Sequence, residues 1–134
     1  MGKKTKIAVS IVVLIFLLLA GGVIPTGKIK THSDYYSDRE ISSAIFMAKL
    51  YFTLNFKGCD LIDIDYAGDE SIPAAQAWAD DSRARKAIVL TSSFHVDSNG
   101  GDGSLEPNKT YEGWKWIMII YLGLIYHHKD HGYG

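Results

Sequence analysis

The segment between His95 and Asn108 holds the residues whose types could bind a metal ion. It contains three acidic side chains, two asparagines and three glycines within 14 residues. A calcium loop of the EF-hand type needs oxygen ligands at positions 1, 3 and 5, glycine at position 6 and glutamate at position 12. Counted from Asp97, position 5 is a glycine, position 6 is an acid and position 12 is Asn108, so the register fails. The calcium hypothesis rests on four candidate ligands: Asp97, Asn99, Asp102 and Glu106.

A loop that only connects two strands explains the same segment without an ion. Asparagine and aspartate form Asx-turns and tolerate left-handed backbone, while glycine supplies positive φ angles. Pro107 would keep the chain from re-entering a sheet too early. We therefore favour a connecting loop and keep a calcium-binding or calcium-stabilised module, through residues 97–106, as the alternative.

Three histidines near the C-terminus are a second candidate for metal chemistry. His127, His128 and His131 surround Asp130, but they lack the i, i+4 spacing on a helix that a zinc protease shows. On a regular strand, His127 and His131 would face one side, and His128 and Asp130 the other. This spacing favours a solvated last strand over a metal site.

Little else in the chain resembles catalytic machinery. The single cysteine, Cys59, excludes an intramolecular disulfide and a zinc site built from several thiolates. His95 with Asp63 and Asp65 would be the only polar cluster available to an enzyme, and no Ser–His–Asp order or P-loop is present. We predict that the protein is not an enzyme and needs no cofactor.

Alternation over residues 111–121 places Trp114, Trp116 and Met118 on one face of a strand. These side chains either line an open ligand pocket or fill the core, and aromatic residues dominate small cores. We favour the core, and we name the same three residues as the candidate ligand-binding surface.

An N-terminal leader segment, residues 1–25, precedes the helices and strands that must position these residues. Lys3, Lys4 and Lys6 precede 18 uncharged residues, 7–24, which as a helix would be about 27 Å long. Basic residues on the N-terminal flank keep that end in the cytoplasm. We predict a membrane anchor within residues 1–25, with the domain outside the cell in a single-pass arrangement. The small residues 20–22 leave cleavage and secretion open.

The charge outside the leader argues against nucleic acid as a partner. The whole chain carries 14 basic and 15 acidic residues, a formal charge of −1. Without the three leader lysines the balance is 11 against 15, or −4. A mildly acidic domain has no electrostatic reason to bind phosphate backbones.

After a polar tether over residues 26–37, the domain is expected to occupy residues 38–134. Ser37 and Glu40 form the S-x-x-E pattern of a capping box, which predicts a helix from residue 38 to about residue 54. Leu54 would widen its apolar face. The predicted buried stripe at helical spacing is Ile41, Ala44, Ile45, Ala48 and Phe52.

Strands and one more helix are expected to follow. Residues 59–66 alternate, with Ile62, Ile64 and Tyr66 on one face and the aspartates on the other. A short helix with Pro73 in its first turn and strands over residues 87–97, 111–121 and 124–134 complete the domain. Sequential strands joined by turns favour antiparallel pairing. The predicted class is α+β, with an amphipathic helix packed on a curved antiparallel sheet.

Several segments resemble a family of uncharacterised exported or membrane-anchored small domains from Gram-positive bacteria, particularly gut anaerobes. The resemblance covers about residues 35 to 134 and is carried by "FKGCDLIDIDYAGD", "VDSNGGDGSLEPN", "TYEGWKWI" and "HGYG". It implies an NTF2-like or cystatin-like layout and no particular activity. Here the segment after the Trp-rich strand is apolar rather than polar. The combined prediction is a non-enzymatic, membrane-anchored module that binds a partner protein or a small ligand.

Overall fold

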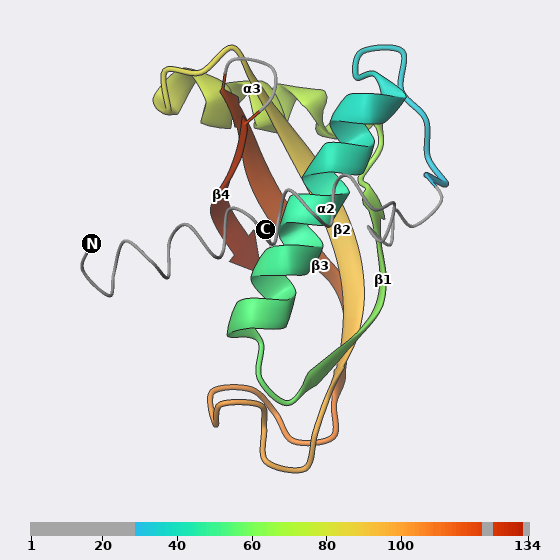
Figure 1. The fold of residues 1–134 in the computed structure, drawn as a ribbon, viewed down its shortest axis with the longest axis vertical. Coiled ribbons are helices and arrows are strands. Elements are labelled where there is room, and N and C mark those ends of the chain that lie inside the picture. The colour runs from blue at the N-terminus through green and yellow to red at the C-terminus, as the bar shows by residue number, and fades with distance from the viewer. Residues whose placement is uncertain (1–28, 122–124, 133–134) are drawn as a thin grey trace, which may run out of the picture.

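The described part of the chain folds into two α-helices and a four-stranded antiparallel sheet (Figure 1). The structure is a computed structural model that describes residues 29–121 and 125–132. The elements in chain order are α2 (Asp38–Asn55), β1 (Cys59–Tyr66), the 3-10 helix η1 (Asp69–Ser71), α3 (Ile72–Asp81), β2 (Lys86–Val96), β3 (Thr110–Tyr121) and β4 (Ile125–Gly132). The sheet order β1-β2-β3-β4 follows the chain, and every neighbouring pair is antiparallel. The predicted α+β class is confirmed.

The predicted leader, residues 1–25 with its apolar span 7–24, lies outside the described residues. Within residues 29–121 and 125–132, neither helix has the length and apolar content needed to cross a bilayer.

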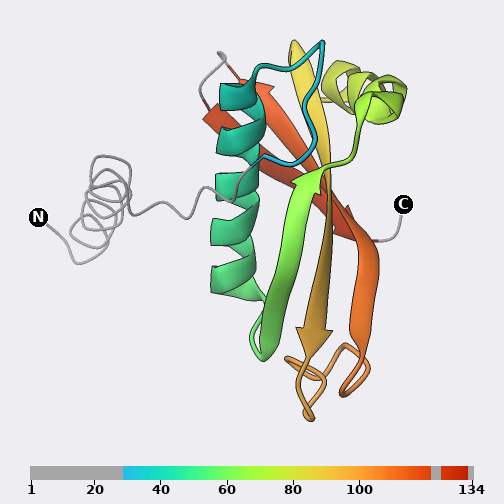
Figure 2. The same cartoon turned by 90° about the vertical axis from the view of Figure 1, so that its right-hand side faces the viewer.

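Helix α2 begins where the sequence predicts. Ser37 accepts a hydrogen bond from the Glu40 amide and Glu40 accepts one from the Ser37 amide, so the capping box is complete. All five residues of the predicted stripe are buried, and Figure 2 shows α2 lying along one face of the sheet. The expectation that Leu54 widens this contact is wrong, because its side chain is 65% exposed near the end of the helix.

Strand β1 does not alternate as predicted in its first half. Its pairing with β2 shifts between Leu61 and Asp63, which is a β-bulge at Ile62. The extra residue moves Leu61 onto the core side with Ile64 and Tyr66, and leaves Ile62 59% exposed. The predicted inward position of Ile62 is therefore wrong.

The second face of the sheet is covered at one end by α3 (Figure 2). Ala75 and Ala79 of α3 pack on Ala87, Val89 and Ile119 of β2 and β3. Small alanines allow the helix to approach the sheet closely, and Trp78 is partly buried beside them. The sheet thus has apolar contacts on both faces, with the larger cluster beneath α2.

Residues 29–37 are not the solvated tether that we expected. Ile29 packs against the main core, and Tyr36 is nearly completely buried in it. The Tyr36 hydroxyl donates a hydrogen bond to the Ala87 carbonyl, and Thr31 Oγ1 donates to Asp65 Oδ2 at 2.7 Å. The aromatic ring and these polar contacts fix the segment to the domain.

Candidate functional site

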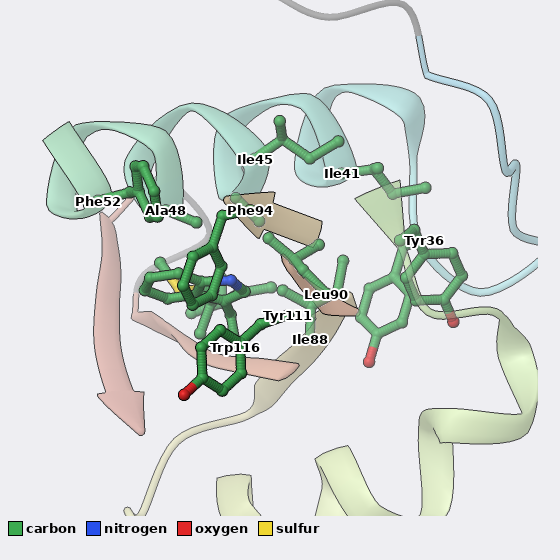
Figure 3. Packing of buried hydrophobic residues seen from close by; sticks show 14 of the residues in the cluster. Tyr36, Ile41, Ile45, Ala48, Phe52, Ile88, Leu90, Phe94, Tyr111 and Trp116 are labelled. Atoms are coloured by element: carbon green, nitrogen blue, oxygen red, sulfur yellow. The ribbon is translucent and has the colours of Figure 1, made fainter. Parts of the chain in front are cut away.

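The Trp-rich strand β3 contributes both to the core and to the surface. Trp114, Trp116 and Met118 share one face, as predicted. Trp116 and Met118 are 0% exposed, and Figure 3 shows Trp116 within the cluster beneath α2. Trp114 is only partly buried. Trp114 lines an open pocket at the end of α2, and Met118 borders a separate, shallower one with Leu50 and His128.

The pocket beside Trp114 has a volume of about 360 Å³. It lies where the C-terminal end of α2, the turn into β1, the 97–108 loop, β3 and β4 meet. Its aromatic walls come from Tyr51, Phe56 and Trp114, and polar groups stand among them. We call it the Trp114 pocket, and its remaining lining residues are Asn55, Lys57, Cys59, Asp102, Ser104, Leu105 and His131.

The walls of the Trp114 pocket are held by aromatic packing. The Trp114 ring meets Phe56 edge-on, with centroids 6.1 Å apart, and stacks with His131 at 5.8 Å. Phe56 also packs edge-on against Phe94 of the core at 5.5 Å. Such contacts add to the free energy of burial and restrain ring positions, so this wall is preformed.

The histidines of β4 are arranged differently from the prediction. The pairing of β3 with β4 shifts between Ile117 and Met118, opposite Asp130 and His128, so Lys129 is the extra residue of a bulge. This bulge places His128 and His131 side by side, with Nε2 and Nδ1 3.0 Å apart. The prediction that they face opposite sides is wrong, and the side chain of His127 lies outside the described residues.

The histidine pair contacts Tyr51, a residue of α2 that lines the Trp114 pocket. The Tyr51 ring lies 4.0 Å from the His128 ring, measured between centroids. Burial lowers the pKa of His131, although Asp130 partly opposes this. His131 therefore presents a neutral imidazole to the pocket at neutral pH, with Nδ1 engaged by His128.

The 97–108 loop uses its acids to hold its own backbone. Asp97 Oδ1 accepts hydrogen bonds from the Asn99 and Gly101 amides, both at 3.0 Å. Asp102 Oδ1 accepts from the Ser104 hydroxyl and, at 2.9 Å, from its amide, and these bonds lower the pKa of Asp102. The predicted Asx-turns are confirmed.

The same geometry does not support a calcium site. Glu106, the fourth candidate ligand, pairs with Lys109 at 2.8 Å and is largely exposed. No three His, Cys, Asp or Glu side chains of the described ranges gather closely enough to hold a metal ion. Asp97 and Asp102 each use Oδ1 to accept hydrogen bonds from amides of the loop.

Two of the three candidate catalytic groups, His95 and Asp65, are used in local contacts. His95 Nδ1 lies 2.9 Å from Thr110 Oγ1 on the neighbouring strand, and Asp65 accepts from Thr31. Burial, followed by the carboxylates of Asp97, Asp102 and Asp60, raises the pKa of the Cys59 thiol. The thiolate, which is the nucleophilic form, is therefore disfavoured.

Sequence reasoning missed Tyr51, Phe56 and His131 as residues of the pocket. Tyr51 and Phe56 lie near the C-terminal end of α2, outside the buried stripe. Aromatic residues outside the core-facing stripe of a helix could have been recognised in the sequence as candidates to line a pocket. His131 could not be found in the same way, because its direction depends on the bulge in β4.

Comparisons with known proteins give no relative for this chain. A scan against protein-family models, a search of curated proteins and a search of solved structures each returned no match. The functional argument therefore rests on the geometry of the site.

Proposed function

We propose that this protein is a non-enzymatic, membrane-anchored extracytoplasmic domain that binds a small polar ligand with a ring in the Trp114 pocket. The observation that carries the proposal is the combination of aromatic and polar side chains in the walls of one preformed pocket. Ligand sites in proteins are concave, largely apolar and oriented by a few polar groups.

The pocket favours a small ligand. Its volume of about 360 Å³ lies near the lower end of the usual range of about 300–1,000 Å³ for ligand sites. Trp114 and Phe56 offer ring faces and edges for stacking, while Asp102 and Ser104 can exchange hydrogen bonds with hydroxyl or amino groups. A compound with a flat or apolar ring face and polar substituents, of monosaccharide size, fits these walls.

A binding role is favoured over catalysis by the state of the titratable groups. The Cys59 thiol is kept protonated by its surroundings, and His131 shares a hydrogen bond with His128. A nucleophile activated by an adjacent base is the usual mark of covalent catalysis. The lining residues of the Trp114 pocket can instead form hydrogen bonds with a ligand.

The rest of the proposal concerns location and layout. Residues 7–24 would anchor the protein in the cell membrane, with the domain on the outer side; cleavage after residues 20–22 would release it instead. The helix α2 lying along one side of a twisted antiparallel sheet supports an NTF2-like or cystatin-like layout, the layout that the family resemblance implies.

The ligand proposal can be tested by saturation-transfer NMR on the full chain in neutral detergent micelles. The probes are glucose, N-acetylglucosamine, tryptophan and tyrosine. We expect at least one to bind, and we expect Trp114→Ala to weaken that binding by roughly tenfold or more. Tyr121→Ala, at the opposite end of β3, is the matched control and retains binding. No saturable binder among the four probes, or equal binding by both variants, would refute the proposal.

The location is tested by cell fractionation. We expect the full chain to stay in the membrane fraction after an alkaline carbonate wash, and an added protease to digest the domain in intact cells with an open cell wall. A product without residues 1–28 should be recovered in the cytosol. Full-length protein free in the cytosol would contradict the anchored arrangement.

A further inference from the structure

A second pocket lies at the end of the sheet opposite the 97–108 loop, with a volume of about 680 Å³. Its lining residues come from the start of α2, the connection from α3 to β2, and the end of β3. Figure 1 shows these segments at the same end of the sheet. Three of its lining residues are basic, Arg83, Arg85 and Lys86, and one is acidic, Glu40. These four side chains carry a formal charge of +2, whereas the whole chain carries −1. We call it the basic pocket.

Among the described residues, Lys86 is the one of the three cations that has an acidic partner. Lys86 Nζ lies 3.3 Å from Glu40 Oε2 and 4.6 Å from the centroid of the Tyr35 ring. Partial burial alone would raise the pKa of Glu40, but the hydrogen bonds from Ser37 and the contact with Lys86 lower it overall. Neither Arg83 nor Arg85 has an ion-pair partner in the part of the chain that the structure describes.

The backbone at Arg83 is set by the end of α3. The Ala84 amide donates to the Ala79 carbonyl at 2.9 Å and the Arg83 amide donates to the Asp80 carbonyl at 3.2 Å, which is a Schellman motif. Arg83 occupies its left-handed position with φ of 56°, where glycine is favoured. The Arg83 backbone is therefore strained where it borders the pocket. The planar guanidinium group of an arginine can donate two parallel hydrogen bonds to the oxygens of a phosphate.

We propose that the basic pocket binds a phosphate-bearing anion through the guanidinium groups of Arg83 and Arg85. The Lys86–Glu40 pair supports one side of the pocket. Ile120 and Tyr121 give it an apolar side that accepts the organic part of a phosphate ester. The phosphate can come from a soluble metabolite or from the headgroup of a membrane lipid, and both present the same oxygens. The proposal is independent of the ligand assigned to the Trp114 pocket.

The test follows the amide signals of Ala84 and Lys86 by NMR, on ¹⁵N-labelled full chain in neutral detergent micelles. Inorganic phosphate and glycerophosphoglycerol, the deacylated headgroup of phosphatidylglycerol, are titrated separately at constant ionic strength, with zwitterionic glycerophosphocholine as the neutral comparison. We expect saturable shifts with at least one of the two anions. A stronger response to inorganic phosphate indicates a soluble ligand, and a stronger response to glycerophosphoglycerol indicates a lipid.

Two variants remove one charge each. Arg83→Gly relieves the left-handed strain, so the fold is retained, and Arg85→Gln alters an exposed side chain. We expect each to weaken anion binding by roughly tenfold. Lys115→Gln, on the part of β3 that does not line the basic pocket, is the matched control and binds as the parent chain does. Absence of saturable shifts with both anions, or binding that Arg83→Gly and Arg85→Gln leave unchanged, would overturn the proposal.

Discussion

At the scale of single residues, Ser92 links the two tryptophans of β3. It is the buried polar residue of the described core, with 2% of its surface exposed. Its hydroxyl accepts a hydrogen bond from Trp116 Nε1 at 2.8 Å and donates to the Trp114 carbonyl at 3.2 Å. A buried polar group is tolerated when it is satisfied in this way, so Ser92 fixes the orientation of the Trp116 indole under the pocket wall.

Replacing Ser92 with alanine should destabilise the protein by about 1–3 kcal/mol, because the buried indole N–H of Trp116 loses its acceptor. Urea unfolding followed by circular dichroism measures this free energy. Ser93→Ala, one residue along β2 on the opposite face, is the control and should change stability by less than about 0.5 kcal/mol. Equal effects of the two substitutions would contradict the role given to the Ser92 hydroxyl.

His131 gives the protein a dependence on pH. Its pKa is lowered from the ordinary 6.5 by burial, so the folded state binds a proton less readily than the unfolded state. The neutral, buried form of His131 therefore stabilises the folded state fully above pH 6.5, and this stabilisation is lost as the pH falls below that value. We expect the urea midpoint to decrease between pH 7 and pH 5, and His131→Gln to flatten that decrease.

His95→Gln serves as the control for this pH series, because His95 is exposed and makes its contact with Thr110 at the surface. It should leave the decrease intact. A pH profile that is identical in the parent chain and in His131→Gln would rule out the assigned cause.

At the scale of elements, the 97–108 loop forms one wall of the Trp114 pocket and depends on glycine conformations. Gly100 and Gly103 both have positive φ, 73° and 102°. They differ in surroundings. A Cβ on Gly100 would lie 2.4 Å from the Leu105 carbonyl oxygen, whereas a Cβ on Gly103 would meet nothing within 4 Å. The backbone thus crosses itself closely at Gly100.

Gly100→Ala should therefore cost more than Gly103→Ala. Both substitutions incur a penalty of about 1–2 kcal/mol for an alanine in left-handed backbone, and only Gly100→Ala adds a clash with backbone. We expect Gly100→Ala to lower the unfolding midpoint further and to weaken any ligand binding in the Trp114 pocket. A lower unfolding midpoint for Gly103→Ala than for Gly100→Ala would contradict the close approach of Gly100 to the Leu105 carbonyl.

At the scale of the whole molecule, the sheet separates two apolar clusters of unequal size. Ile119 belongs to the smaller cluster beneath α3 and is fully buried, while Ile62 on the bulge of β1 is largely exposed. Their environments differ because α3 covers only one end of the second face.

Ile119→Ala should destabilise the protein by about 2–5 kcal/mol through the cavity that it leaves. Ile62→Ala removes the same atoms from an exposed position and should change stability by less than about 0.5 kcal/mol. Thermal or urea unfolding of both variants measures the contrast. A small loss for Ile119→Ala would mean that α3 contributes little to the folded state.

The features that could be predicted from the sequence are those set by neighbouring residues. The Ser37–Glu40 cap, the stripe of α2 and the turns of the 97–108 loop all depend on contacts within a few positions. The bulges at Ile62 and Lys129 could not be predicted, because no glycine or proline marks them and each reverses the faces beyond it. Of the Trp114 pocket only Trp114 was named from the sequence, and the basic pocket was not predicted, since both pockets form where elements distant in sequence meet.

The docked N-terminal segment limits where the domain can stand. Ile29 is already part of the folded body, and the proposed span ends at Ile24, so five peptide steps connect them, reaching at most about 17 Å. The domain would be held flush with the bilayer rather than sampling a wide volume around its point of attachment. With residues 7–24 in the membrane, as proposed, a ligand would be bound only close to the lipid surface, and the domain would not reach assemblies that project far from it.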